Sequence, residues 1–105
     1  MNLNQISGLG PFTQKTEKLD NYSSRDIFFP SNADKPFLII NKNTIELRTD
    51  PKLGKLLISK YESIMQSRYF GIHGLEIVAS ADQLKKDELA DLIRLSYNLT
   101  KSTDS

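Results

Sequence analysis

The chain has 105 residues, of which 38% are hydrophobic, and this is enough to build one domain with a modest core. Fourteen Lys and Arg residues oppose 13 Asp and Glu residues, so the net charge of +1 lacks the strong basic excess that is typical of nucleic-acid-binding domains. The absence of cysteine excludes disulfides, iron–sulfur clusters, thiolate zinc sites and cysteine nucleophiles.

The sequence carries no signal for export or for a membrane. Residues 1–5 have neither the basic nor the apolar run of a signal peptide. The longest apolar run in the chain has four residues, whereas a membrane helix needs roughly 20. We therefore expect a cytoplasmic protein that makes no membrane contact.

One domain is expected over residues 1–105. Its first part, residues 1–22, is polar and contains glycine. The pattern of this part predicts only a turn around residues 7–11 and a short helical turn before it. Residues 100–105 are expected to form a polar tail.

Strand patterns begin after this segment. Residues 25–29 have the composition of a strand and stop at Pro30. Residues 36–40 indicate a buried strand, and residues 44–48 alternate between outward and inward positions, with Glu46 outward. Because the asparagines between them suit a tight turn, residues 36–48 are predicted to form a β-hairpin.

A helix is predicted to follow the hairpin. Thr49 and Asp50 can cap the first backbone N–H groups, and Pro51 suits the first helical position. Apolar residues then recur at helical spacing, which predicts a helix over residues 51–65. Residues 67–74 are expected to be a connector.

The C-terminal part is predicted to contain a strand over residues 75–79, a turn over residues 80–82 and a helix over residues 85–99. The buried face of this last helix is expected to consist of Leu89, Leu92, Ile93 and Tyr97. Three or four strands and two amphipathic helices predict a two-layer α+β fold with a small, mostly antiparallel sheet.

The order of these elements and four short motifs resemble the MmcQ/YjbR family of small bacterial proteins. The motifs are Lys35–Ile39, Ile45–Thr49, Asp50–Leu53 and Glu88–Leu99. In that family an Asp-Pro-Glu-Leu-like element opens the middle helix and a Ser-Tyr-x-Leu element closes the last one. The N-terminal domain of TfoX-like competence regulators is similar in outline. The resemblance implies a small α+β fold and DNA binding.

Few residues are suited to catalysis. His73 is the only histidine, and there is no Gly-x-Ser-x-Gly nucleophile elbow. One histidine with scattered carboxylates fits no zinc spacing, and no EF-hand loop is present. Gly8 and Gly10 lack the third glycine and the following helix of a phosphate loop. We therefore expect no enzyme activity, no catalytic residue, no metal site and no cofactor.

Two groups of residues are candidates for a binding surface. The ordered basic residues are Arg48, Lys52, Lys55, Lys60 and Arg68. They form either a solvated face, which is the commoner role of such residues, or a surface that contacts DNA phosphates in weak, salt-sensitive binding. Tyr69 and Phe70, beside Arg68, either seal the core or form a stacking platform for bases or a small planar ligand.

Two hypotheses for the function follow. The first is a small non-enzymatic binding module, with DNA as the ligand that the family resemblance implies. The alternative is a protein–protein interaction or homodimeric structural role, through a sheet edge or a dimer face, without nucleic-acid binding. The first hypothesis predicts binding that weakens with salt, and the alternative predicts oligomerisation or a protein partner.

Overall fold

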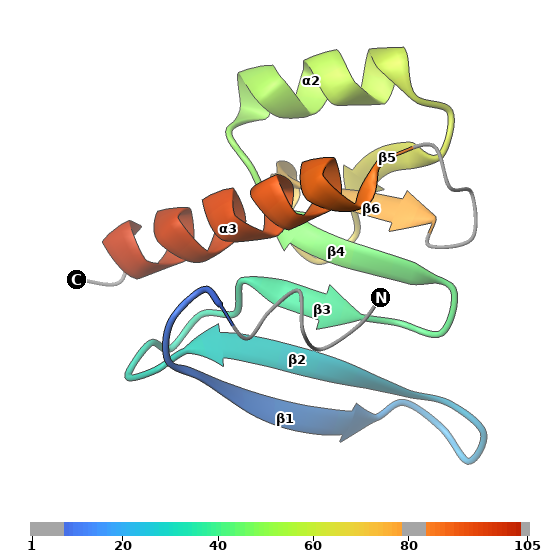
Figure 1. Ribbon diagram of the computed structural model, residues 1–105. Coiled ribbons are helices and arrows are strands. Elements are labelled where there is room, and N and C mark those ends of the chain that lie inside the picture. The colour runs from blue at the N-terminus through green and yellow to red at the C-terminus, as the bar shows by residue number, and fades with distance from the viewer. Residues whose placement is uncertain (1–7, 79–83, 104–105) are drawn as a thin grey trace.

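A six-stranded antiparallel sheet is the frame of the computed structural model of this chain, which describes residues 8–78 and 84–103. The strands, in their order across the sheet, are β1 (Phe12–Lys18), β2 (Ser24–Pro30), β3 (Leu38–Ile40), β4 (Thr44–Arg48), β6 (Gly71–Val78) and β5 (Ile64–Ser67) (Figure 1). Two helices pack on one face: α3 (Lys86–Thr103) on β2 to β4, and α2 (Pro51–Lys60) on β5 and β6. The predicted two-layer α+β fold is confirmed.

The predicted hairpin is confirmed as β3 and β4. Leu38 lies opposite Leu47, and both are fully buried because they face the helices. The backbone N–H of Asn41 donates to the carbonyl of Thr44 at 2.8 Å and closes the turn. The predicted strand over residues 25–29 is confirmed as β2.

The predicted start of α2 is confirmed, but its predicted end at residue 65 is wrong. Asp50 caps the helix by accepting from the backbone N–H of Leu53 at 3.3 Å, and Pro51 follows it. The helix ends at Lys60, and Ile64 begins β5, where it pairs with Ile77 and is buried. The helical spacing of the apolar residues continues past residue 60, but pairing with β6 overrides it.

Two further strand assignments differ from the sequence predictions. The predicted connector over residues 67–74 is reduced to the turn 68–70, because β6 already begins at Gly71. Gly71 has a φ of +63°, which favours glycine at this point of the turn. β1 was not predicted, since Phe12 is its only apolar residue; it forms by pairing along its whole length with β2. The predicted turn at residues 80–82 lies outside the described residues.

The last helix is confirmed, and it is longer than predicted. It continues to Thr103, so most of the expected polar tail is helical. Thr100 is fully buried and donates from Oγ1 to the carbonyl of Ser96 at 2.8 Å. Of the predicted buried face, Ile93 and Tyr97 are buried, whereas the leucines at positions 89 and 92 are only partly buried.

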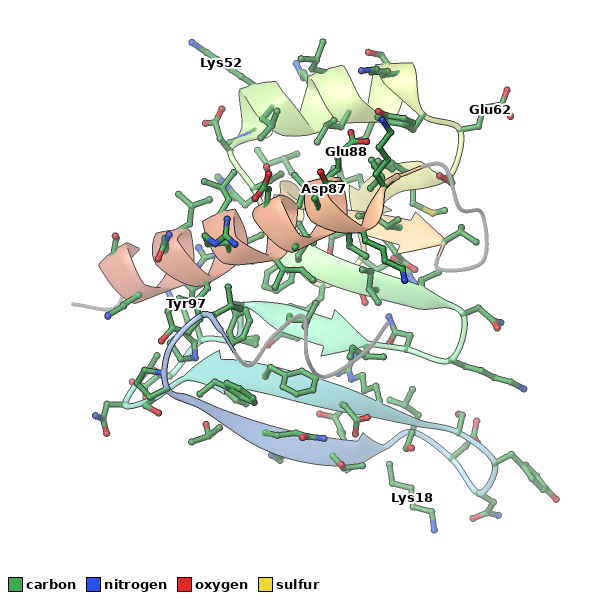
Figure 2. All side chains as sticks on the ribbon, viewed as in Figure 1. Lys18, Lys52, Glu62, Asp87, Glu88 and Tyr97 are labelled. Atoms are coloured by element: carbon green, nitrogen blue, oxygen red, sulfur yellow. The ribbon has the colours of Figure 1, made fainter. Side chains whose placement is uncertain are left out.

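Ser96 and Tyr97 attach α3 to the sheet and to the start of β1. Ser96 Oγ donates to the carbonyl of Phe37 and accepts from the backbone N–H of Arg48 at 2.8 Å. The Tyr97 ring lies between α3 and the sheet (Figure 2), edge-on to Phe37, and its hydroxyl donates to the carbonyl of Pro11 at 2.8 Å. Within residues 8–78 and 84–103, no helix is long and apolar enough to cross a membrane.

Candidate functional site on the open face of the sheet

The face of the sheet opposite α2 and α3, here called the open face, carries two buried glutamates. Ile45 and Leu47 of β4 point into the core below the helices. Glu46 lies between them and therefore points to the open face, where the register places it directly opposite Glu76 of β6. Both glutamates are only 2% exposed. The prediction that Glu46 points away from the apolar core is correct, but its side chain is buried rather than solvated.

Glu46 is held by three hydrogen bonds. Its Oε1 accepts from Ser67 Oγ at 2.8 Å and from the backbone N–H of Tyr69 at 3.0 Å. Its Oε2 accepts from Asn41 Nδ2 at 2.9 Å. Since a buried carboxyl group without partners is strongly unfavourable, these bonds are what allow the Glu46 side chain to lie inside the protein.

Glu76 is held by an arginine. Arg68 donates to both of its oxygens, from Nε at 3.0 Å and from Nη2 at 2.8 Å, and Thr44 Oγ1 donates at 3.0 Å. Burial alone would raise the pKa of Glu76, but the hydrogen bonds from Arg68 and Thr44 and the charge of Arg68 together lower it below the ordinary value. Glu76 is therefore ionised at neutral pH, and the pair with Arg68 is a charged one.

The turn formed by residues 68–70 folds back over the open face. Ser67 Oγ accepts from the backbone N–H groups of Tyr69 at 3.2 Å and Phe70 at 2.9 Å, which fixes the path of the turn. Phe70 packs on Gly74 of β6. A Cβ atom at Gly74 would lie 2.5 Å from Cβ of Phe70 and 2.7 Å from the carbonyl oxygen of Leu47, so only glycine fits below the turn.

Tyr69 and two arginines form the outer layer of the site. Tyr69 is 49% exposed, and its ring meets the ring of Phe70 edge-on, with 5.0 Å between the ring centres. The guanidinium carbon of Arg25 lies 5.7 Å from the centre of the Tyr69 ring, and Arg25 is also paired with Glu17 at 2.8 Å. The side chain of Arg68 is 77% exposed, although both of its contacts to Glu76 are short.

A cavity of about 240 Å³ opens beside Tyr69. It is lined by Leu19, Arg25, Asn41, Glu46, Arg68 and Tyr69. The Nε atom of Arg25 is buried and has no hydrogen-bond partner among the described residues. The cavity therefore lies between an exposed aromatic residue, two arginines and a buried carboxyl group.

A second hollow, of about 310 Å³, lies at the turn between β1 and β2. Its central polar group, Asp20, accepts from the backbone N–H groups of Tyr22 at 2.7 Å and Ser23 at 2.8 Å. These local bonds also lower the pKa of Asp20. Because Asp20 is used to close the turn, the cavity beside Tyr69, which two arginines also line, is the better candidate for a site.

The five basic residues predicted from the sequence do not lie on one surface. Arg68 reaches the cavity, and Arg48 shares the open side of β4 with Glu46. Lys52, Lys55 and Lys60 belong to α2, on the helical side of the sheet, and Lys52 projects away from the sheet in Figure 2. Lys60 Nζ lies 5.2 Å from the centre of the Tyr61 ring.

The sequence identified Arg68, Tyr69 and Phe70 but missed the residues that support them. A signal for Glu46 and Glu76 was present, because each is a charged residue with apolar residues on both sides within a strand. In a central strand of an antiparallel sheet, such a pattern indicates that the face opposite the apolar core carries polar contacts. The sequence carries no comparable signal for Arg25 and Asn41, because only the pairing of the strands brings these residues to the cavity.

His73 is not part of the site. It lies in β6 rather than in the predicted connector, and its side chain is exposed. Its carbonyl accepts from the backbone N–H of Thr49 at 2.9 Å. Within the described ranges, no three His, Asp or Glu side chains are grouped so that they could hold a metal ion.

Comparison of the chain with known protein-family models, with curated proteins and with solved structures finds no match.

Proposed function

We propose that this chain is a non-enzymatic module that binds nucleic acid through the open face of its sheet. One observation carries the proposal: the half-exposed ring of Tyr69 lies at a cavity beside two guanidinium groups, those of Arg25 and Arg68. Exposed aromatic rings stack on bases, and arginine pairs with phosphate or with base edges.

The buried glutamates below this surface favour a binding role. Two buried carboxylates give less stability than apolar residues of the same volume, so their presence in a small sheet calls for another explanation. Glu46 holds the backbone of Tyr69, and Glu76 holds the guanidinium of Arg68. These bonds hold in place the backbone that carries an exposed tyrosine and the guanidinium of an exposed arginine, which reduces the entropy lost when a ligand binds.

The family resemblance supports the same proposal. Asp50 and Pro51 begin α2, and Ser96 and Tyr97 attach α3, so two of the four motifs that resemble the MmcQ/YjbR family have structural roles here. We propose a relation to that family, with its DNA-binding function, and a location in the cytoplasm. The proposed contact surface is the open face rather than the lysines of α2.

Anisotropy titrations of labelled single-stranded and duplex DNA at low and at moderate salt test this proposal. We expect dissociation constants in the micromolar range that rise as salt is added, because arginine–phosphate contacts release counterions. Tyr69→Ala is expected to weaken binding at least about fivefold, since stacking on a base contributes about 1–3 kcal/mol.

Tyr22→Ala is the matched control, because Tyr22 is 97% exposed and does not line the cavity. Absence of binding at low salt would exclude the nucleic-acid function. Equal loss of binding in the two variants would show that the contact surface is not the one proposed.

A protein-interaction role has its own observation in its favour. β1 lies at the edge of the sheet, and its outer side has no strand partner among the described residues. Met65 and Ile72, near the opposite edge, are 43% and 62% exposed. Sedimentation or size-exclusion measurements that show a dimer at micromolar concentration, together with no DNA binding, would favour this role.

A further inference from the structure

The outer edge of β1 presents backbone groups that have no strand partner among the described residues. In an antiparallel pair, hydrogen-bonded and non-bonded residue pairs alternate along the strands. The backbone N–H of Leu19 donates to the carbonyl of Ser23 at 3.0 Å, and the N–H of Ser31 donates to the carbonyl of Pro11 at 3.1 Å. Because the register of β1 with β2 is unbroken between these two bonds, the odd-numbered residues of β1 bond to β2. The N–H and carbonyl groups of its even-numbered residues therefore point away from the sheet.

β1 lacks most of the features by which proteins protect such an edge. These features are proline, bulges, short length and lysine. β1 has seven residues, contains no proline and pairs with β2 in an unbroken register. Lys15 is a protective residue, but Glu17 lies two positions along on the same face, where it pairs with Arg25 at 2.8 Å. The charges of the strand therefore restrict which partner can pair with it rather than exclude every partner.

A second copy of β1 is a partner that these charges fit. Two copies of one strand pair antiparallel about a two-fold axis, and their outward groups meet only where even-numbered residues face even-numbered residues. The axis can then pass Gln14, Lys15 or Thr16 and still keep most of the strand paired. At Lys15 two lysines would face each other, which is unfavourable, and at Gln14 each Lys15 would face Thr13. Only at Thr16 does Lys15 of each copy lie opposite Glu17 of the other, which is a favourable pair made twice.

We propose that the protein forms a homodimer in which β1 pairs antiparallel with β1 of a second copy, with the two-fold axis at Thr16. Glu17 uses Oε1 for Arg25, so its other carboxylate oxygen can accept from Lys15 of the second copy. The axis is perpendicular to the sheet, so the sheets of the two copies become one and their open faces lie on the same side. This inference goes beyond the proposed function and holds whether or not the open face binds nucleic acid.

Sedimentation equilibrium of the full chain, over concentrations from about 1 to about 500 µM, tests the inference. We expect a reversible equilibrium between monomer and dimer with a dissociation constant in the micromolar range. The dimer is expected to be weak because one strand edge is a smaller interface than the about 1,600 Å² of a standard protein complex. A monomer at every concentration would overturn the inference.

Lys15→Glu tests the charge pairs across the axis. The variant would place a carboxylate opposite Glu17 of the other copy at both positions, so we expect the dissociation constant of the dimer to rise at least about tenfold. Lys52→Glu makes the same change of charge on α2 and is the matched control, which is expected to leave the dissociation constant unchanged. Circular dichroism checks that both variants are folded. Equal dissociation constants of the two variants would overturn the inference.

Thr16→Cys tests the position of the axis, because the chain has no other cysteine. Residues that form a hydrogen-bonded pair have Cα atoms about 5.5 Å apart, within the range of about 4.4–6.8 Å that a disulfide spans. Under mild oxidation we expect this variant to form a disulfide-linked dimer on a non-reducing gel. Gln14→Cys, on the same side of β1, is the matched control, since its two sulfurs would lie about 13 Å apart along the strands. Equal cross-linking of the two variants would overturn the inference, even if the protein is a dimer.

Discussion

Gly74 shows how one residue controls the site. It lies in the middle of β6, where glycine is unfavourable because it loses more conformational freedom on folding than other residues. Its lack of a side chain leaves room for Phe70, whose turn carries Arg68 and Tyr69. The sequence marks this position as part of a connector, because a glycine between two strands and a glycine within a strand look alike.

Gly74→Ala is expected to destabilise the protein by about 1–3 kcal/mol, since the added methyl group overlaps Phe70 and the carbonyl of Leu47. Urea denaturation measures the change. Gly8→Ala is the matched control, because a Cβ atom at Gly8 meets nothing within 4 Å. Equal stability of the two variants would mean that the turn does not lie on Gly74.

Glu76 makes stability depend on pH. Its pKa in the folded protein is below the ordinary value of 4.5, which is the value expected in the unfolded chain. The stabilisation is therefore complete above about pH 4.5 and is lost as the pH falls through the lower pKa of the folded state. Glu76→Gln is expected to reduce this acid sensitivity, and urea denaturation at several pH values between 3 and 7 measures it. An unchanged pH profile in this variant would assign the acid sensitivity to other carboxylates.

At the scale of elements, local pattern and strand pairing each decide part of the fold. The hairpin and α3 were predictable, because Leu38 to Ile40 form a continuous apolar run and the apolar residues of α3 recur at helical spacing. β1 and β5 were not, because β1 is polar and the apolar residues that begin β5 continue the spacing of α2. Both strands depend on pairing with the next strand along the chain rather than on their own pattern of residues.

The attachment of α3 can be measured at Tyr97, which is 2% exposed. Tyr97→Ala is expected to destabilise the protein by about 3–5 kcal/mol, because it empties a core site beside Phe37. Tyr97→Phe removes only the hydrogen bond to Pro11 and is expected to lose about 1 kcal/mol. Thermal and urea denaturation measure both. A similar loss in the two variants would assign the effect to the hydroxyl rather than to packing.

At the scale of the whole molecule, the residues that stabilise the fold and those of the candidate site lie on opposite faces of the sheet. The apolar core lies between the sheet and the two helices, whereas the polar groups of the site lie on the opposite face. This separation could not be derived from the sequence, since the residues of the site come from three different parts of the chain: Arg25, the hairpin residues Asn41 and Glu46, and Tyr69. Periodicity shows which side of each strand is apolar, but only the strand order shows which polar sides become neighbours.

The bond between Tyr97 and Pro11 has a consequence for the order in which the protein assembles. It joins positions 86 residues apart, so the last helix completes the contacts of the first strand. During synthesis β1 leaves the ribosome long before α3 exists, and until then the apolar side of β2 to β4 lacks the helix that covers it. Contacts between such distant parts of a chain slow folding, and exposed apolar strands favour aggregation. The sheet before α3 has formed is therefore the stage at which this chain is most exposed to aggregation.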